Sequence, residues 1–261
     1  MRISVITVCY NAENVIEQTM QSVLNQSYTD IEYIIVDGAS TDRTSEFVQK
    51  YIADKRVRYI SEPDNGIYDA MNKGIRLATG DYLEFLNAGD VFVNDDVIKS
   101  VVQKIEENPA DVMYGDIIYE YPDKTTSIRV YGQFCSSLFY YLLGDCINHQ
   151  AIFAKRECFE RHIFNTEYRI CADREWMMRI KKAGKSFYAM NLLICRYPLD
   201  EDSVSVKNKE LCDKEAEACV KKHLMTGYPV FWILNKVRSG KVSAKVLHWC
   251  YEAVFLREKK Q

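Results

Sequence analysis

The sequence lacks the features that mark several large classes of protein. Its 34 Lys and Arg residues are outnumbered by 37 Asp and Glu residues, whereas nucleic-acid binders normally carry a basic stripe that neutralises phosphates. No apolar run approaches the ~20 residues that a helix needs to span a bilayer. These absences argue against a nucleic-acid partner and against a membrane-spanning protein, and they favour small polar substrates.

Several common catalytic and binding motifs are also missing. The chain contains no GxSxG, no GxxxxGK[S/T] and no GxGxxG, and its four histidines have no ligand spacing. The sequence therefore argues against a serine hydrolase, a P-loop protein, a dinucleotide-binding enzyme and a zinc protein.

The cysteines and the N-terminus bear on the compartment. Nine cysteines lie singly inside apolar stretches, with no CxxC pair and an odd total, which is typical of reduced and buried thiols. The N-terminus enters a strand at once, without a basic leader or a cleavage site. We therefore expect a cytoplasmic protein, with a reservation about the C-terminal end.

Alternating strands and helices are expected in the first 110 residues. The runs 3–8 and 33–36 are unbroken apolar strands, as expected when helices cover both faces of a parallel sheet. Further strands are predicted at 57–60 and 82–86, and a helix should follow each of the four. Ser40 or Thr41 should cap the second helix and Asn94 the fourth. Right-handed crossovers would make this a Rossmann-like half.

Beyond residue 110 the pattern changes to strands at 111–121 and 125–131 around a Pro122-Asp123-Lys124 turn. A helix near 134–143, a strand at 150–154, a helix at 172–183 and a strand at 187–195 are predicted next. We expect an α/β fold with a mixed, mainly parallel central sheet and a C-terminal helical extension. The expected boundaries are 1–206 for the main domain, divided into halves 1–110 and 111–206, and 207–261 for the extension.

The last residues of the chain, 229–261, combine strongly apolar segments with surrounding Lys and Arg residues. Amphipathic basic helices of this kind bind anionic membrane surfaces, which would place the protein at the inner face of the cell membrane. Packing of these helices on the main domain, or on a second copy in a homodimer, is at least as good an interpretation.

Three polar clusters stand where apolar strands should end: Cys9-Tyr10-Asn11, the run 36–44, and Asn87-Ala88-Gly89-Asp90. In open α/β sheets ligands collect at the carboxyl ends of the strands. The three clusters therefore describe one shared site, which is polar, acidic and assisted by glycine. Such a site indicates an enzyme.

The order of Cys9-Tyr10-Asn11, VDGASTDRT at 36–44, EPDNGIYDAMNKGIRLATGD at 62–81 and FLNAGD at 85–90 resembles glycosyltransferase family 2. Members of this family are inverting enzymes with the GT-A fold. The resemblance covers roughly the first 200 residues. It implies a nucleotide-sugar donor and a glycan or lipid-linked acceptor as partners.

The resemblance also implies a nucleotide site, in which Asp37 accepts a hydrogen bond from the base imide. The alternative is that this loop only forms a turn and caps a helix, but capping alone does not require a carboxylate at Asp37. Asp69 and Lys73 would reach the diphosphate or the sugar, although a solvated helix face explains them equally well. The predicted nucleotide-binding residues are Cys9, Tyr10, Asn11, Asp37, Ser40, Asp42, Asp69 and Lys73.

Family members carry an Asp-x-Asp element that binds a divalent metal after the fourth strand. This chain departs from it, because Asn87 and Gly89 stand where acidic residues are usual. Asp90 remains as the one clear carboxylate, and Asn87 can offer a carbonyl oxygen. We expect Mn²⁺ or Mg²⁺ as the cofactor, held by Asp90 and Asn87, with a simple tight turn as the alternative.

The resemblance places the catalytic base at Asp173, at the start of a helix. Asp173 lies three and four residues before Trp176 and Met177, which puts it on the inward face of that helix. The alternative is a first-turn Asp favoured by the helix dipole. Glu175 is the second candidate for the base.

His149 and Gln150 match a His-Gln pair of this branch of the family and would border the sugar or acceptor pocket. A lone histidine is more often structural, however. Asp116 and Glu175 are the other residues expected to line this pocket.

These features together predict an inverting, metal-dependent glycosyltransferase that moves a sugar from a UDP-sugar to a hydroxyl of a surface glycan. Two alternatives stay open. A nucleotidyltransferase shares the layout, but normally begins with a glycine-rich basic loop that is absent here. A non-catalytic nucleotide-sugar-binding scaffold would explain why the metal-binding motif has fewer acidic residues than usual, although the presence of Asp173 argues against it.

Overall fold

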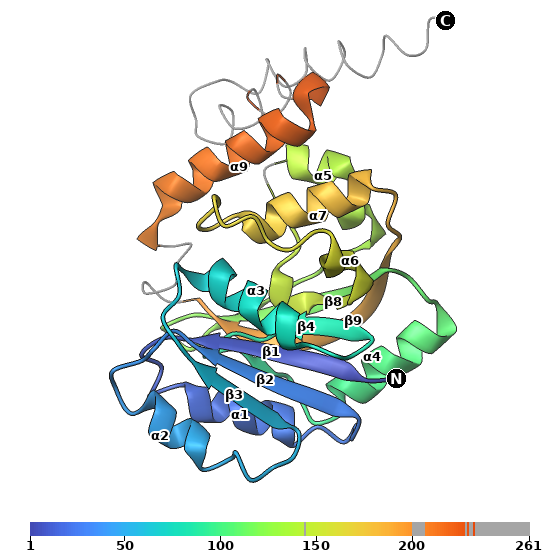
Figure 1. Cartoon of the computed structure of the whole chain (residues 1–261). Helices are drawn as coiled ribbons and strands as arrows, with labels where there is room; N and C mark the ends of the chain where they lie inside the picture. The colour runs from blue at the N-terminus through green and yellow to red at the C-terminus, as the bar shows by residue number, and fades with distance from the viewer. Residues whose placement is uncertain (144, 200–206, 228, 230–231, 233–261) are drawn as a thin grey trace, which may run out of the picture.

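A computed structural model of the chain describes residues 1–143, 145–199, 207–227, 229 and 232. One nine-stranded sheet runs through the molecule, and helices cover both of its faces (Figure 1). The strands follow the order β3-β2-β1-β4-β8-β6-β9-β5, and β7 pairs with β6 outside this path. The predicted mixed α/β sheet is confirmed.

The first half of the sheet is entirely parallel. β1 (Ile3–Cys9) pairs with both β2 (Ile31–Asp37) and β4 (Tyr82–Phe85), and β2 pairs with β3 (Val57–Ser61). Every residue of β1 is buried, because α1 (Ile16–Leu24) and α2 (Thr44–Gln49) lie on one face and α3 (Ile67–Leu77) on the other (Figure 1). The unbroken apolar pattern of the strand follows from this double cover.

Two predicted helix caps are wrong. α2 begins at Thr44, and neither Ser40 nor Thr41 caps it. Instead, Asp42 Oδ1 accepts the backbone N–H of Thr44 at 2.9 Å. The fourth helix, α4 (Val97–Glu107), begins after Asp96 without a side-chain cap. Asn94, near which the cap was predicted, lies two residues before this N-cap position, and its Oδ1 accepts from the N–H of Asp96 at 2.9 Å in a local turn.

The second half of the sheet mixes strand directions. β8 (Ile152–Lys155) lies antiparallel between β4 and β6 (Val112–Glu120), while β9 (Phe187–Pro198) runs parallel to β6. The hairpin strand β7 (Thr126–Arg129) is antiparallel to β6. β5 (Val91–Phe92) pairs antiparallel with β9 and was not predicted, because two residues are too few to show a period.

Short helices replace two of the predicted elements. The helix predicted at 134–143 is split into η1 (Gln133–Ser136) and α5 (Leu138–Leu142) by the extended backbone of Ser137. The strand predicted to begin at Gln150 begins at Ile152, after the 3₁₀ turn η2 (His149–Ala151). α6 (Glu157–Glu160) follows β8 and was not predicted, whereas the helix predicted at 172–183 is confirmed as α7 (Ala172–Lys182).

The C-terminal helix α9 (Lys209–His223) packs against α7 and is followed by η3 (Met225–Gly227) (Figure 1). Glu215 of α9 accepts the backbone N–H groups of Arg169, Ile170 and Cys171 at 2.8, 2.9 and 2.9 Å. This carboxylate thereby holds the turn that precedes α7. The segment 229–261, apart from residues 229 and 232, lies outside the described residues.

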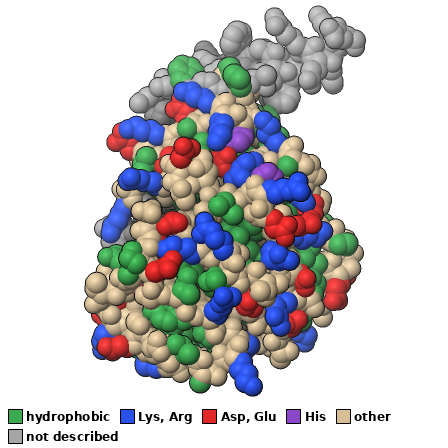
Figure 2. All heavy atoms as spheres, viewed as in Figure 1, with side chains coloured by type: hydrophobic (Ala, Val, Ile, Leu, Met, Phe, Trp, Pro, Cys, Tyr) green, Lys and Arg blue, Asp and Glu red, His purple; other side chains and the backbone are tan. Residues whose placement is uncertain are grey.

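The surface carries no extended region of one charge on the face viewed in Figure 2, where basic and acidic side chains are interspersed. This agrees with the near-balanced composition and with the absence of a basic stripe. Within the described part of the chain, no helix has both the length and the apolar character needed to cross a membrane.

Candidate active site

Asp37 ends β2 and is fully buried. Its carboxylate accepts hydrogen bonds from the hydroxyls of Tyr59 and Ser61 at 3.1 and 2.6 Å, and from the hydroxyl and the N–H of Ser40. A carboxylate has about four lone-pair positions, so these donors occupy Asp37 in this state. The residue fixes the loop that follows β2, and a contact with a ligand requires one hydroxyl to turn away.

The turn after β1 lies directly against this loop. Cys9 Sγ is 3.8 Å from Asp37, and burial, followed by the nearby carboxylate, raises the pKa of the thiol. Asn11 has a φ of 48°, a left-handed conformation in which Asn is enriched. Its N–H donates to Ser40 Oγ at 2.8 Å. Tyr10 projects outward and is 64% exposed.

Asp64 was not predicted as a site residue, but the structure places its carboxylate directly over Gly38, beside the ring of Tyr10. A Cβ atom at position 38 would collide with this carboxylate. A larger residue at position 38 would displace the end of the Asp64 side chain, and Tyr10 and Asp64 form the outer edge of the loop after β2. In the sequence, the proline and glycine of the 62–66 segment indicate a turn but do not show that Asp64 reaches Gly38.

The three other predicted nucleotide residues act mainly within the protein. Asp42 accepts the N–H of Glu13 at 3.0 Å, in addition to that of Thr44. Lys73 donates to the carbonyl of Pro63 at 2.6 Å and pairs with Glu62 at 2.9 Å, so it holds the 62–66 turn. Asp69 accepts the N–H of Asn65 at 3.0 Å and lines a separate pocket described below.

Asp90 follows β4 in a turn that Gly89 closes with a φ of 103°. Its side chain points inward and is 3% exposed. Burial raises the pKa of Asp90 to about 7, against the opposing effects of His149 and Gln150. Beside it, burial raises the pKa of the fully buried Glu84 well above its ordinary value, and Asp90 adds to this shift.

The Asn87–Asp90 turn carries two candidate oxygen ligands for a divalent cation. Asp90 Oδ2 and Asn87 Oδ1 are both buried and lack a hydrogen-bond partner among the described residues. Across those same residues, no cluster of three or more His, Cys, Asp or Glu side chains can hold a metal ion. Two hard oxygen donors fit a cation such as Mg²⁺, which keeps several waters and binds substrate phosphates.

Asn87, His149 and Asp173 form one hydrogen-bonded chain. Asn87 Nδ2 lies 2.9 Å from His149 Nε2, and His149 Nδ1 lies 3.2 Å from Asp173 Oδ2. With the amide of Asn87 donating, Nε2 accepts and Nδ1 carries the proton that His149 donates to Asp173. The predicted base is thereby connected to the predicted metal turn, and the side chains of His149 and Asp173 are 15% and 14% exposed.

Tyr68 holds Asp173 from the opposite side. Its hydroxyl donates to Asp173 Oδ1 at 3.0 Å and also lies 2.7 Å from the carbonyl of Ile170. The inward orientation expected for Asp173 from helical phasing agrees with these contacts. Tyr68 was not predicted as a site residue, although it lies within the 62–81 motif on the buried face of α3.

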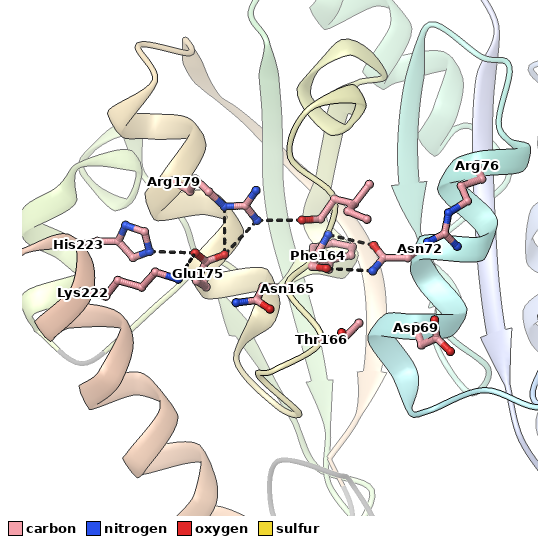
Figure 3. Close-up of a pocket in the computed structure, with 11 residues that line it drawn as sticks. Asp69, Asn72, Arg76, Phe164, Asn165, Thr166, Glu175, Arg179, Lys222 and His223 are labelled. Atoms are coloured by element: carbon pink, nitrogen blue, oxygen red, sulfur yellow. Dashed lines mark hydrogen bonds and ion pairs between the residues drawn. The ribbon is translucent and has the colours of Figure 1, made fainter.

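Three predicted pocket residues do not join this chain. Asp116 accepts the N–H of Tyr131 at 2.7 Å and so joins β6 to the segment after β7. Gln150 is buried, and its proximity to Asp90 opposes the rise in the pKa of that carboxyl. Glu175 faces away from Asp173, toward Arg179 and His223 (Figure 3). Burial alone would raise the pKa of Glu175. The hydrogen bonds from His223 and Arg179, together with the positive charge of Arg179, outweigh it and lower the pKa to about 2.

The chain was compared with proteins of known sequence. It is 34% identical over 180 residues to a PGL/p-HBAD biosynthesis glycosyltransferase of Mycobacterium bovis, which covers 67% of this chain and 68% of that protein. It is 31% identical over 116 residues to glycosyltransferase GlyA of Streptococcus pneumoniae, covering 44% of this chain and 16% of that protein.

Solved structures show the same fold. S. aureus TarS superposes with a TM-score of 0.67 at 16% identity, covering 91% of this chain and 72% of that chain. A mannosyltransferase of Pyrobaculum calidifontis, in complex with GDP-Man and Mn²⁺, superposes with a TM-score of 0.61 at 17% identity, covering 99% and 81%. The family model described as glycosyl transferase family 2 matches residues 4–172. The chain therefore belongs to glycosyl transferase family 2, and its GT-A-like fold agrees with that membership.

Proposed function

We propose that this glycosyltransferase moves a sugar, with inversion, from a UDP-sugar to a hydroxyl of a glycan or lipid-linked acceptor during surface polysaccharide synthesis. One observation carries the proposal: His149 and Tyr68 hold the carboxylate of Asp173 beside the turn that contains Asn87 and Asp90. A base and a leaving-group site therefore share one edge of the sheet. This arrangement suits group transfer between two bound substrates.

Asp173 acts as the general base. Its carboxylate takes the proton of the acceptor hydroxyl, and that oxygen forms a bond to the anomeric carbon from the face opposite the diphosphate. The bond between the anomeric carbon and the phosphate oxygen breaks, and the nucleoside diphosphate leaves with the electron pair. The hydrogen bonds that His149 and Tyr68 donate to the Asp173 carboxylate fix the direction in which it points.

Asp90 and Asn87 would hold a divalent cation through the two oxygens that lack partners. Such an ion supplies positive charge that stabilises the departing diphosphate. Ionisation of the buried Asp90 is costly without a cation. The pair therefore suits a metal that arrives with the donor.

The nucleotide would lie against the loop that Asp37 organises. Tyr10 offers an exposed aromatic face to the base. Asp64 could accept a hydrogen bond from a base imide directly, whereas Asp37 could do so only after one of its protein donors turns away. UDP is favoured as the nucleotide because TarS, which shares the fold, is known in complexes with UDP and UDP-GlcNAc.

The replacement Asp173→Asn tests the proposal. It keeps the size of the side chain but removes the base, so it should lower donor hydrolysis and transfer at least about 100-fold. Binding of UDP with Mn²⁺, measured by isothermal titration calorimetry, should stay within about twofold of wild type. Asp95→Asn, an exposed substitution, is the control and should leave both quantities unchanged.

Two outcomes of this experiment would contradict the proposal. Near-normal turnover by Asp173→Asn would remove Asp173 as the base. Binding of UDP by the wild type without hydrolysis of any donor in a panel of UDP- and GDP-sugars would instead favour a non-catalytic scaffold.

A further inference from the structure

A pocket of about 490 Å³ lies next to the candidate active site and is not used by the steps above. Figure 3 shows it between α3 on one side and α7 with α9 on the other, with the segment 163–166 between them. Asp69, Asn72 and Arg76 enter from α3, at spacings of three and four residues along one face. The pocket is large enough for a sugar ring with a charged substituent.

One wall of this pocket carries an excess of positive charge. Arg179, Lys222 and His223 approach the single carboxylate of Glu175 at 3.0, 3.5 and 2.9 Å. Glu175 is 1% exposed, and its low pKa keeps it ionised. One negative charge cannot balance both Arg179 and Lys222, so the wall as a whole remains cationic.

Arg76 adds a further positive charge from the opposite wall. Its side chain is exposed, and within the described ranges it has no ion-pair or hydrogen-bond partner. Asp69 is the second acidic residue of the pocket and accepts the N–H of Asn65 at the start of α3. An arginine without a protein partner can bind a planar anion through two parallel N–H groups.

The pocket and Asp173 are bordered by the same two helices, α3 and α7, although Glu175 and Asp173 point to different sides of α7. Glu175 lies two residues after Asp173 on α7, and Asp69 directly follows Tyr68, which bonds to Asp173. Phe164 contributes to this pocket and also to the small cavity lined by His149 and Asp173. A ligand of the pocket is thus separated from the reacting groups by one layer of side chains.

We propose that this pocket binds an anionic group of the acceptor, either a phosphate or a sugar carboxylate, between Arg76 and the Arg179–Lys222 wall. The inference rests on the proposed glycosyl transfer and adds a substrate class to it: the acceptor is acidic. The reacting hydroxyl would lie at Asp173, and the anionic group would lie on the other side of Tyr68.

The test measures anion binding while the nucleotide site is filled. Protein saturated with UDP and Mg²⁺ is titrated with inorganic phosphate, with glucuronate and with glucose, and ligand-observed NMR gives the dissociation constants. We expect phosphate or glucuronate to bind and glucose not to bind. Whichever anion binds more tightly identifies the phosphate or the carboxylate as the natural group.

Matched variants locate the binding. Arg76→Gln should raise the dissociation constant of the bound anion at least about fivefold, because one attractive charge is lost. Arg161→Gln is the control, since Arg161 is also exposed and its side chain makes no hydrogen bond or ion pair within residues 1–143, 145–199 and 207–227. This control should leave the dissociation constant of the anion unchanged and should retain donor hydrolysis.

The inference is overturned if neither anion binds to the UDP-saturated protein, if glucose binds as tightly as glucuronate, or if Arg76→Gln and Arg161→Gln bind equally well. If the wild-type protein does not hydrolyse any nucleotide-sugar donor, the proposed function is contradicted instead. The two failures are therefore distinguishable.

Discussion

Replacing Asp90 with Asn should stabilise the metal-free protein while it abolishes transfer. The carboxylate is 3% exposed, and one of its oxygens has no hydrogen-bond partner among the described residues. Asn keeps nearly the same shape and cannot ionise. Under the proposed role of Asp90 as a metal ligand, its buried carboxylate lowers the stability of the metal-free protein.

The magnitude follows from the pKa of Asp90, which burial raises from an ordinary 3.8 to about 7. Because the folded-state pKa is raised, the protonated form favours folding below pH ~4, and this contribution is lost as the pH rises through about 7. At 1.36 kcal/mol per pKa unit, full ionisation costs about 4 kcal/mol. Between pH 5 and pH 8 the advantage of Asp90→Asn over wild type should grow by roughly 3 kcal/mol.

The measurement is urea unfolding followed by tryptophan fluorescence in EDTA, at pH 5 and pH 8, for wild type and Asp90→Asn. Trp176 is buried in the core and reports the loss of packing. Asp95→Asn at the surface is the control, and its difference from wild type should be the same at both pH values.

A difference between Asp90→Asn and wild type that stays constant from pH 5 to pH 8 would refute this reasoning. It would mean that the carboxylate is solvated in the empty protein. Addition of Mn²⁺ with UDP should stabilise the wild type more than the variant, because only the wild type retains the charged ligand.

Three further outcomes follow from the site. His149→Asn keeps a donor near the position of Nδ1, so in hydrolysis assays it should retain more activity than His149→Ala, which should lose about 10- to 100-fold; equal losses would exclude a positioning role. Asp37→Asn should lower the free energy of unfolding by about 1–3 kcal/mol in urea, because its amide N–H₂ would face the hydroxyl and amide donors that surround the carboxylate. Glu175→Gln should cost about 3 kcal/mol in the same assay, since it leaves Arg179 and His223 without their carboxylate; an unchanged midpoint would contradict either assignment.

The parallel half of the fold could be predicted from sequence because its signal is local. Each residue of β1 is buried, so its sequence is apolar except at Ser4 and Thr7. β5 could not be predicted in this way, since its two residues depend on the distant strand β9 for their pairing. Split elements such as η1 and α5 were missed because Ser137 interrupts the helix without a proline or glycine to mark the break.

The candidate site shows the same division. Helical phasing was enough to orient Asp173 inward, and the strand ends placed Asn87 and Asp90 at one edge. Partners from distant parts of the chain could not be read from spacing: Tyr68 lies 105 residues before Asp173. The opposite orientations of Asp173 and Glu175 were also not distinguished, although two residues on a helix are about 200° apart.

The contact between Glu215 and the turn at 169–171 has a consequence for how the chain is divided. The family match ends at residue 172, so a fragment cut to that match would lose α7 and α9. Even a longer fragment that ends before residue 215 would leave three backbone N–H groups without their acceptor, directly ahead of the helix that carries Asp173. Minimal expression of the enzyme should therefore extend through α9, and residue 215 should be one of the least replaceable positions outside the shared family region.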